Sequence, residues 1–276
     1  QEVVEEEALL DDSSQARSEL RNLLPQVLAF LQTHAVHSSD SCIAAMRCLQ
    51  AWLALQTGCS LLLLFSSYPS LLGAALHALT SDKEALISAA ADALLELLSA
   101  ANTAFSLSSP PAREAAQTVA AQLHSMAQEL SFVEKAADGP VDDDLMHFCR
   151  VLCAFAERAV DLIATTDGTF LQIVHLMLCT LGGELRVAEL TVEFWCGIQD
   201  TALTQRHEQL REPLYRQVNQ LIMRQCTLPA DFTTWDDSDL LQEEDFVRFR
   251  EQSALEVLGV CLQLLHAEFI GSLRSL

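Results

Sequence analysis

The sequence predicts an all-α fold: an α-solenoid of antiparallel helix hairpins, HEAT/armadillo-like, wound into a right-handed superhelix. Apolar residues recur at spacings of three and four along almost the whole chain, and no long stretch alternates with period two. Consecutive apolar segments pair into hairpins about every 40 to 60 residues, which is typical of such repeats. A compact helical bundle is the alternative, but the length of 276 residues and the lack of a shared central helix favour the solenoid.

Five helices are expected in the N-terminal half. The first two carry stripes of leucine and other apolar residues, and Pro69 suits the first turn of the third. Ser81 and Glu84 have the spacing of a capping box at the start of the fourth, and Pro110-Pro111 opens the fifth. The expected segments are 17–33, 40–56, 69–80, 82–100 and 111–135.

Five more helices are expected in the C-terminal half. The sixth opens with three acids, Asp142-Asp143-Asp144, which are favourable at a helix N-terminus. The seventh ends at Gly182-Gly183, a helix stop signal. The expected segments are 142–164, 169–181, 185–203, 207–226 and 245–272.

One continuous stretch, 1–276, is expected to hold about five HEAT-like repeats from the middle of a longer superhelix. The chain starts at Gln1 without a Met, and residues 1–12 form an acidic leader unlike the basic start of a signal peptide. The longest connection, 227–245, is an acidic loop, and long ordered loops are often functional.

The charge restricts the classes of partner. There are 16 Lys and Arg against 38 Asp and Glu, a formal net charge of −22. A nucleic-acid binder needs a basic surface to displace counterions, so direct nucleic-acid binding is not expected. Half of the residues are apolar, which is enough for a buried core. The excess of acids therefore favours basic protein partners.

The nine cysteines and the uncharged stretch 48–81 have simple structural interpretations. The cysteine number is odd, no Cys-x-x-Cys pair occurs, and most cysteines lie in apolar runs, which predicts free, buried thiols. Polar residues around Tyr68-Pro69 interrupt the apolar tract, so two buried helices joined by a turn explain it better than membrane insertion.

We find no catalytic, cofactor or metal motif. His147, Cys149 and Cys153 share a predicted helix, but they lack a second ligand pair at zinc spacing, and apolar residues on that helix favour a core face. No phosphate-binding loop, nucleophile elbow or His-Glu-x-x-His motif occurs. The sequence therefore predicts a binding protein and not an enzyme.

The acidic loop is the candidate partner-binding site. No Lys or Arg lies between Arg224 and Arg248, so nothing in this stretch neutralises its acids. A dense acidic surface attracts basic proteins over a distance and then holds them by many modest contacts. We predict a contact with a basic protein partner at Asp231, Asp236, Asp237, Asp239, Glu243, Glu244 and Asp245.

Three blocks of sequence resemble a known family. They are residues 187–200 (VAELTVEFWCGIQD), residues 213–218 (PLYRQV), and the run from Leu228-Pro229 through Trp235 to Phe246-Val247-Arg248-Phe249-Arg250. Together they resemble the importin-13/transportin-3 branch of the importin-beta superfamily, the karyopherins, and their order and spacing are closer to importin-13. Weaker similarity runs back through 48–53 and 147–151.

The resemblance implies a nuclear transport receptor that shuttles between cytoplasm and nucleus. Such receptors are superhelices of HEAT repeats that bind protein cargo, contact Phe-Gly nucleoporins and change cargo affinity with Ran-GTP. This chain would be a central fragment, and loop 231–245 would make the mid-chain Ran contact. Transportin-3 holds its phosphorylated cargo with an Arg-rich helix, and no such helix occurs here.

Two other functions stay open at this point. One is a HEAT-repeat scaffold or adaptor subunit that holds partners without a nucleotide switch. The other is a non-catalytic helical part of a larger enzyme. A requirement for Ran-GTP distinguishes the receptor from the scaffold, and turnover of a substrate would favour the enzyme.

Overall fold

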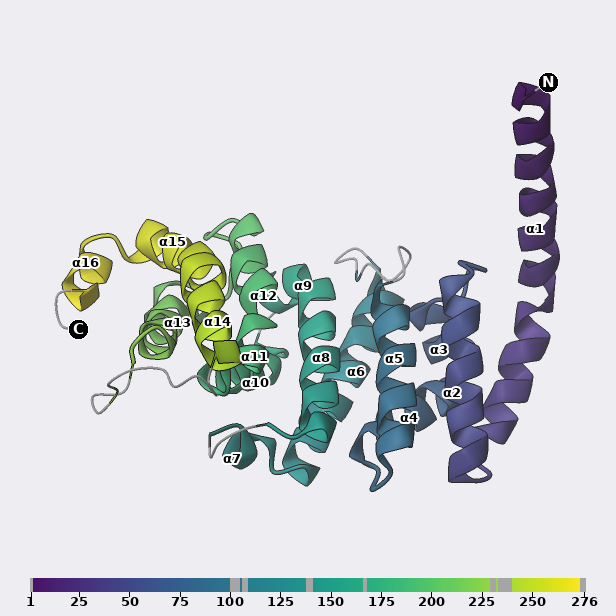
Figure 1. Cartoon of the computed structure of the whole chain (residues 1–276), viewed down its shortest axis with the longest axis horizontal. Coiled ribbons are helices and arrows are strands. Elements are labelled where there is room, and N and C mark those ends of the chain that lie inside the picture. Colours follow the sequence, from purple (N-terminus) through teal and green to yellow (C-terminus); the bar gives the residue numbers. More distant parts are fainter. Residues whose placement is uncertain are drawn as a thin grey trace. The chain divides into compact units, whose positions relative to one another are not determined.

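The computed structural model describes residues 2–99, 105, 109–137, 141–165, 168–228, 232 and 240–273, without the side chains of 2–14 and 240–242. Every regular element within these residues is a helix, which confirms the all-α class and the helical-repeat architecture (Figure 1). The chain divides into two compact units, Gln1–Ala104 and Phe105–Leu276. The number of repeats and the right-handed superhelix stay predictions.

Unit 1 packs five α-helices around a leucine- and alanine-rich core. Helices α2 and α5 contact each other most extensively, and α1 contacts both α2 and α4. Leu28 of α1, Met46 of α2 and Ala90 of α5 are fully buried. The elements are α1 (Glu2–His34), α2 (Ser39–Ala54), α3 (Leu61–Ser67), α4 (Pro69–His77), the short η1 (Ala78–Thr80) and α5 (Glu84–Ser99).

Two boundaries in unit 1 differ from the prediction. Helix α1 begins at Glu2, much earlier than residue 17, because its first turns are built from good helix formers such as Glu, Ala and Leu. The predicted capping box at Ser81 is wrong, since α5 begins at Glu84 and the Ser81 hydroxyl accepts from the Lys83 amide at 3.2 Å instead. Helix α2 is capped as a serine cap should be, by Ser38.

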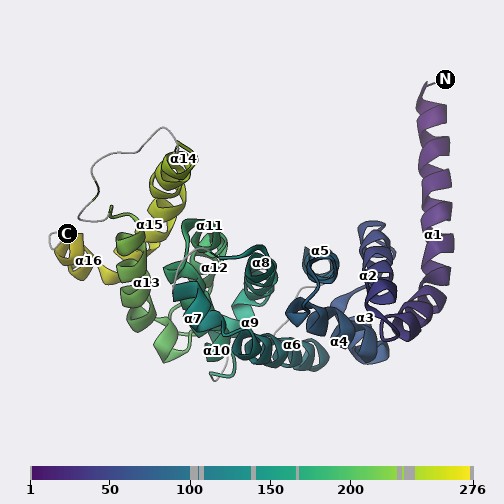
Figure 2. The ribbon, with the colours of Figure 1, turned by 60° about the horizontal axis from the view of Figure 1, so that its bottom comes forward.

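Unit 2 stacks its helices in two layers, which Figure 2 shows. Helices α6, α10 and α13 form one layer, and α8, α12 and α15 form the other, with each helix in contact with the next in its layer. The elements are α6 (Pro110–Glu129), α7 (Phe132–Ala137), α8 (Asp143–Arg158), α9 (Val160–Thr165), α10 (Leu171–Gly182), α11 (Leu185–Glu189), α12 (Val192–Gly197), η2 (Ile198–Asp200), η3 (Glu208–Leu210), α13 (Glu212–Gln225), α14 (Leu240–Arg248), the π-helical η5 (Phe249–Ser253), α15 (Ala254–Leu265) and α16 (Ala267–Leu273).

Several predicted helices of unit 2 are broken into shorter ones. The segment 185–203 divides at Thr191, whose hydroxyl donates to the Ala188 carbonyl at 2.7 Å and accepts from the Trp195 indole at 2.9 Å. Such side-chain bonds to the preceding turn compete with the helical ladder and bend it. The segment 245–272 is interrupted by a π-helical turn and ends its main helix at His266, where φ is +46°.

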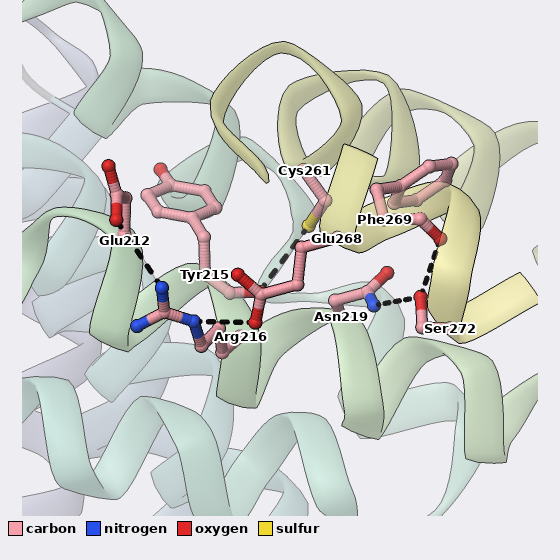
Figure 3. Close-up of polar contacts among 8 residues, drawn as sticks. All are labelled: Glu212, Tyr215, Arg216, Asn219, Cys261, Glu268, Phe269 and Ser272. Atoms are coloured by element: carbon pink, nitrogen blue, oxygen red, sulfur yellow. Dashed lines mark hydrogen bonds and ion pairs between the residues drawn. The ribbon is translucent and has the colours of Figure 1, made fainter. Parts of the chain in front are cut away.

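The core of unit 2 is tied together by Tyr215 on α13. Its hydroxyl donates to the Trp195 carbonyl of α12 at 2.8 Å. Its own carbonyl accepts from the Cys261 thiol of α15 at 3.8 Å (Figure 3). Trp195 is fully buried. The residues of the family-like block 187–200 therefore hold helices together.

Helix α16 is joined to α13 by polar contacts. Arg216 of α13 pairs with Glu268 at 2.7 Å and with Glu212 at 3.3 Å, and the Asn219 amide donates to the Ser272 hydroxyl at 3.0 Å (Figure 3). The Arg216 pairs are exposed, so each contributes only about 0–1 kcal/mol.

All nine cysteines are free, as predicted, but only five of them are buried. The other four are half-buried: Cys48, Cys179, Cys196 and Cys226. Within the described part of the chain, no single helix is both long and apolar enough to cross a membrane. Helices α3 and α4–η1 meet that test only when taken together, and they are bent by 113° relative to each other.

Candidate functional site

The predicted acidic site falls partly on described residues. Glu243, Glu244 and Asp245 lie on α14, where Glu244 is exposed and the other two are half-buried. The remaining predicted residues lie outside the described part of the chain: Asp231, Asp236, Asp237 and Asp239. The predicted contact with Ran or basic cargo thus stays a prediction, and the surroundings of α14 show what such a contact would meet.

Helix α11 contacts both α14 and α8, and Glu184 joins the start of α11 to the segment just before α8. One oxygen of the Glu184 carboxylate accepts from the Val141 amide at 2.9 Å, and the other accepts from Arg186 at 2.6 Å. These two donors lower the pKa of Glu184, with Arg186 the larger cause, so this carboxylate is anionic at neutral pH. Asp142 caps α8 and accepts from the Leu145 amide at 2.8 Å.

The Arg186 guanidinium is influenced by carboxylates from three elements. Its pKa is raised first by Glu184 and then by the charges of Asp143 on α8 and Asp245 on α14. Charges from three elements therefore act on one arginine, and of these three carboxylates Glu184 forms the ion pair with it, at 2.6 Å.

Helix α14 is attached to α11 through Glu189. Arg248 of α14 pairs with the Glu189 carboxylate at 3.2 Å and with Asp245 at 2.9 Å. The same Glu189 carboxylate accepts from the Ser253 hydroxyl at 3.0 Å, and Ser253 ends the π-helical turn. Asp245 is three residues before Arg248 on the same helix, whereas the Glu189 contact joins residues 59 positions apart.

We call this surface the acidic ledge. It carries eight carboxylates and two arginines, so it stays strongly negative after the ion pairs are counted. The sequence does not predict that the carboxylates of α8 and α11 belong to this surface, because α8, α11 and α14 are distant along the chain. The run Asp142-Asp143-Asp144 is visible in the sequence, but there it indicates only a helix N-terminus. Its members are Asp142, Asp143, Asp144, Glu184, Glu189, Glu243, Glu244 and Asp245, with Arg186 and Arg248.

A second group of carboxylates lies near the other end of α8. Burial and the neighbouring charge of Glu193 on α12 raise the pKa of Glu157 to about 7. The Cys196 thiol has its pKa raised to about 11, first by burial and then by Glu256, Glu193 and Asp200. The layer formed by α8, α12 and α15 is therefore acidic at this end as well.

The described carboxylates and cysteines are suited to partner binding and not to nucleophilic attack. Cys149 and Cys153 are buried on α8, and burial raises the pKa of Cys149 to about 12, so these thiols are poor nucleophiles. Among the described residues no three His, Cys, Asp or Glu side chains are placed to hold a metal ion. Exposed carboxylates, in contrast, accept hydrogen bonds from Lys and Arg side chains of a partner.

One comparison with known proteins gives a match. Residues 141–227, about a third of the chain, match the model of the family described as the Transportin-3/Importin-13 second TPR domain. The matched range runs from the start of α8 to the end of α13 and includes two of the three blocks that resemble the importin-beta superfamily. TPR and HEAT repeats are both antiparallel helix pairs. No curated protein gives a significant match.

Proposed function

We propose that this chain is a segment of a nuclear transport receptor of the importin-beta superfamily and that it helps bind protein cargo and Ran-GTP. The match of residues 141–227 to the Transportin-3/Importin-13 repeat family carries the proposal. As part of such a receptor, the chain shuttles between cytoplasm and nucleus and works beside surfaces that contact Phe-Gly nucleoporins.

The acidic ledge is the proposed Ran or cargo contact. Glu243, Glu244 and Asp245 continue the acidic loop, and α8 and α11 add five carboxylates beside them. A net charge of −22 attracts basic partners from a distance, and the ledge holds them by charge-assisted hydrogen bonds. Arg248 joins α14 to α11 through Glu189, and Arg186 pairs with Glu184 at the start of α11.

The proposed mechanism is reciprocal coupling without chemistry. Ran-GTP and cargo bind one helical stack, and each changes the affinity for the other by overlap or by a change in curvature. Such coupling is equal in both directions by thermodynamic necessity. Repeats contact mainly their neighbours, so small changes in each repeat can add up.

The test measures binding of this chain to Ran loaded with a non-hydrolysable GTP analogue and to Ran-GDP. We expect selective binding of the GTP form, weakened about tenfold by the triple change E243Q/E244Q/D245N because three charged contacts are lost. The matched control E114Q/E129Q/E134Q removes three exposed carboxylates from α6 and α7.

The outcomes test two hypotheses separately: the transport-receptor function, and the acidic ledge as its Ran contact. GTP-selective binding that both triple variants leave unchanged would support the transport-receptor function but would exclude the acidic ledge as the Ran contact. Equal binding of the two Ran forms, or none, would contradict the receptor and favour a scaffold without a nucleotide switch.

A further inference from the structure

Unit 2 has a cavity of about 350 Å³, lined by both polar and apolar residues, that is separate from the acidic ledge. Its lining comes from the loop before η3, the start of α13 and the end of α15. The lining residues are Leu203, Thr204, Arg211, Glu212, Gln263, Leu264 and His266.

Arg211 is the cation of this cavity, and its position is fixed. Its Nε and Nη2 atoms both donate to the carbonyl oxygen of Arg206, at 3.0 and 2.8 Å. Arg206 is itself buried, and its side chain donates to the Thr201 carbonyl at 2.6 Å and to Gln199 at 3.3 Å. The Arg211 guanidinium therefore loses little conformational entropy on binding.

Arg211 also lacks a carboxylate partner. Arg186, Arg216 and Arg248 form ion pairs, but Arg211 forms none with any described residue, although the chain is rich in acids. The nearest candidate, Glu212, directs its carboxylate to Arg216 on the same helix at 3.3 Å (Figure 3). With Nε and Nη2 held by one carbonyl, the Nη1 side stays available for an acceptor.

We propose that this cavity binds a carboxylate group of a partner peptide, with Arg211 as its cation. The Thr204 hydroxyl and the Gln263 amide supply further donors, and Leu203 and Leu264 supply apolar walls for a neighbouring apolar side chain. A planar, singly charged carboxylate matches one edge of one guanidinium, whereas a doubly charged phosphate would face Glu212 with a single cation to compensate it. The site goes beyond the proposed transport function and does not depend on it.

The test uses the whole chain and three short probes. Acetyl-Ala-Leu-Glu-Leu-Ala-amide offers a side-chain carboxylate, acetyl-Ala-Leu-Ala-Leu-Ala with a free C-terminus offers a terminal one, and acetyl-Ala-Leu-Gln-Leu-Ala-amide is the neutral match. Binding is followed by NMR of the arginine side-chain Nε–Hε resonances, which report Arg211 directly.

We expect a carboxylate probe to bind with a Kd of about 1 mM and to shift the Arg211 resonance. The Gln probe should bind about tenfold more weakly because it cannot form charge-assisted hydrogen bonds. Comparison of the Glu probe with the free-acid probe shows whether the cavity prefers a side-chain carboxylate or a C-terminal one.

Variants assign the effect to the cavity. R211K keeps the charge but loses the fixed guanidinium, so affinity for the carboxylate probe should fall about tenfold. T204V and Q263L leave the bonds between Arg211 and Arg206 in place and should each lower affinity a few-fold. The control R224Q removes an exposed arginine from the far end of α13 and should change nothing.

Three results would overturn the proposal. The first is equal binding of the Glu and Gln probes. The second is carboxylate binding that R211K, T204V and Q263L all leave unchanged. The third is no shift of the Arg211 resonance by either carboxylate probe at about 10 mM, about tenfold above the expected Kd.

Discussion

Glu157 is a half-buried carboxylate whose ionisation opposes folding. Burial, and to a smaller extent the charge of Glu193, raise its pKa from 4.5 to about 7. The folded chain therefore keeps a proton that the unfolded chain releases between about pH 4.5 and 7. Stability falls as pH rises through this window, and the penalty is constant above it.

We predict that E157Q stabilises unit 2 at pH 8 and has little effect at pH 4.5. The full pKa shift corresponds to about 3 kcal/mol, and partial exposure reduces the expected gain to about 1 kcal/mol. Urea unfolding of both proteins at the two pH values measures it, with the exposed E114Q as control. An equal gain at both pH values would assign the effect to packing and not to ionisation.

For single residues, helical spacing predicts burial well. Leu24, Leu28 and Leu31 of α1, like Val187, Phe194 and Ile198 of unit 2, are buried as their helical spacing predicts. The acidic ledge and the Arg211 cavity were not predictable. Their members are brought together by tertiary packing, and contacts such as Glu189–Arg248 leave no periodic signal.

At the scale of elements, boundaries were less predictable than helices. The long segments 142–164 and 245–272 are helical, yet each is divided by turns that tertiary contacts select. The π-helical turn at 249–253 is one example. Ser253 at its end reaches Glu189 of α11, and the sequence alone gives no reason for the extra residue in that turn.

We predict that E189Q loosens α14. The change weakens the contacts of one carboxylate with both Arg248 and Ser253, so the amides of 243–253 should exchange about fivefold faster. Hydrogen exchange followed by mass spectrometry measures this, with α13 as internal reference. E244Q, on the exposed side of α14, is the matched control, and equal acceleration by both variants would contradict the role of Glu189.

For the whole molecule, the division into two units has a consequence for charge. Unit 2 contains 26 acidic and 12 basic residues, and unit 1 contains 12 acidic and 4 basic ones, so their formal net charges are −14 and −8. The larger part of the net negative charge that attracts basic partners therefore lies in unit 2, although unit 1 is acidic as well. That unit also holds the family match and the ledge.

We predict that residues 105–276 fold without unit 1 and keep any GTP-selective Ran binding. Unit 2 has its own core around Trp195 and Tyr215, and solenoid repeats depend mainly on their neighbours. The isolated unit should unfold cooperatively in urea, with a midpoint that matches one of two transitions in the intact chain. Residues 1–104 alone are the control and should not prefer Ran-GTP. A non-cooperative 105–276 would show that its core needs unit 1, and a folded 105–276 without the GTP preference of the intact chain would place the Ran contact in unit 1.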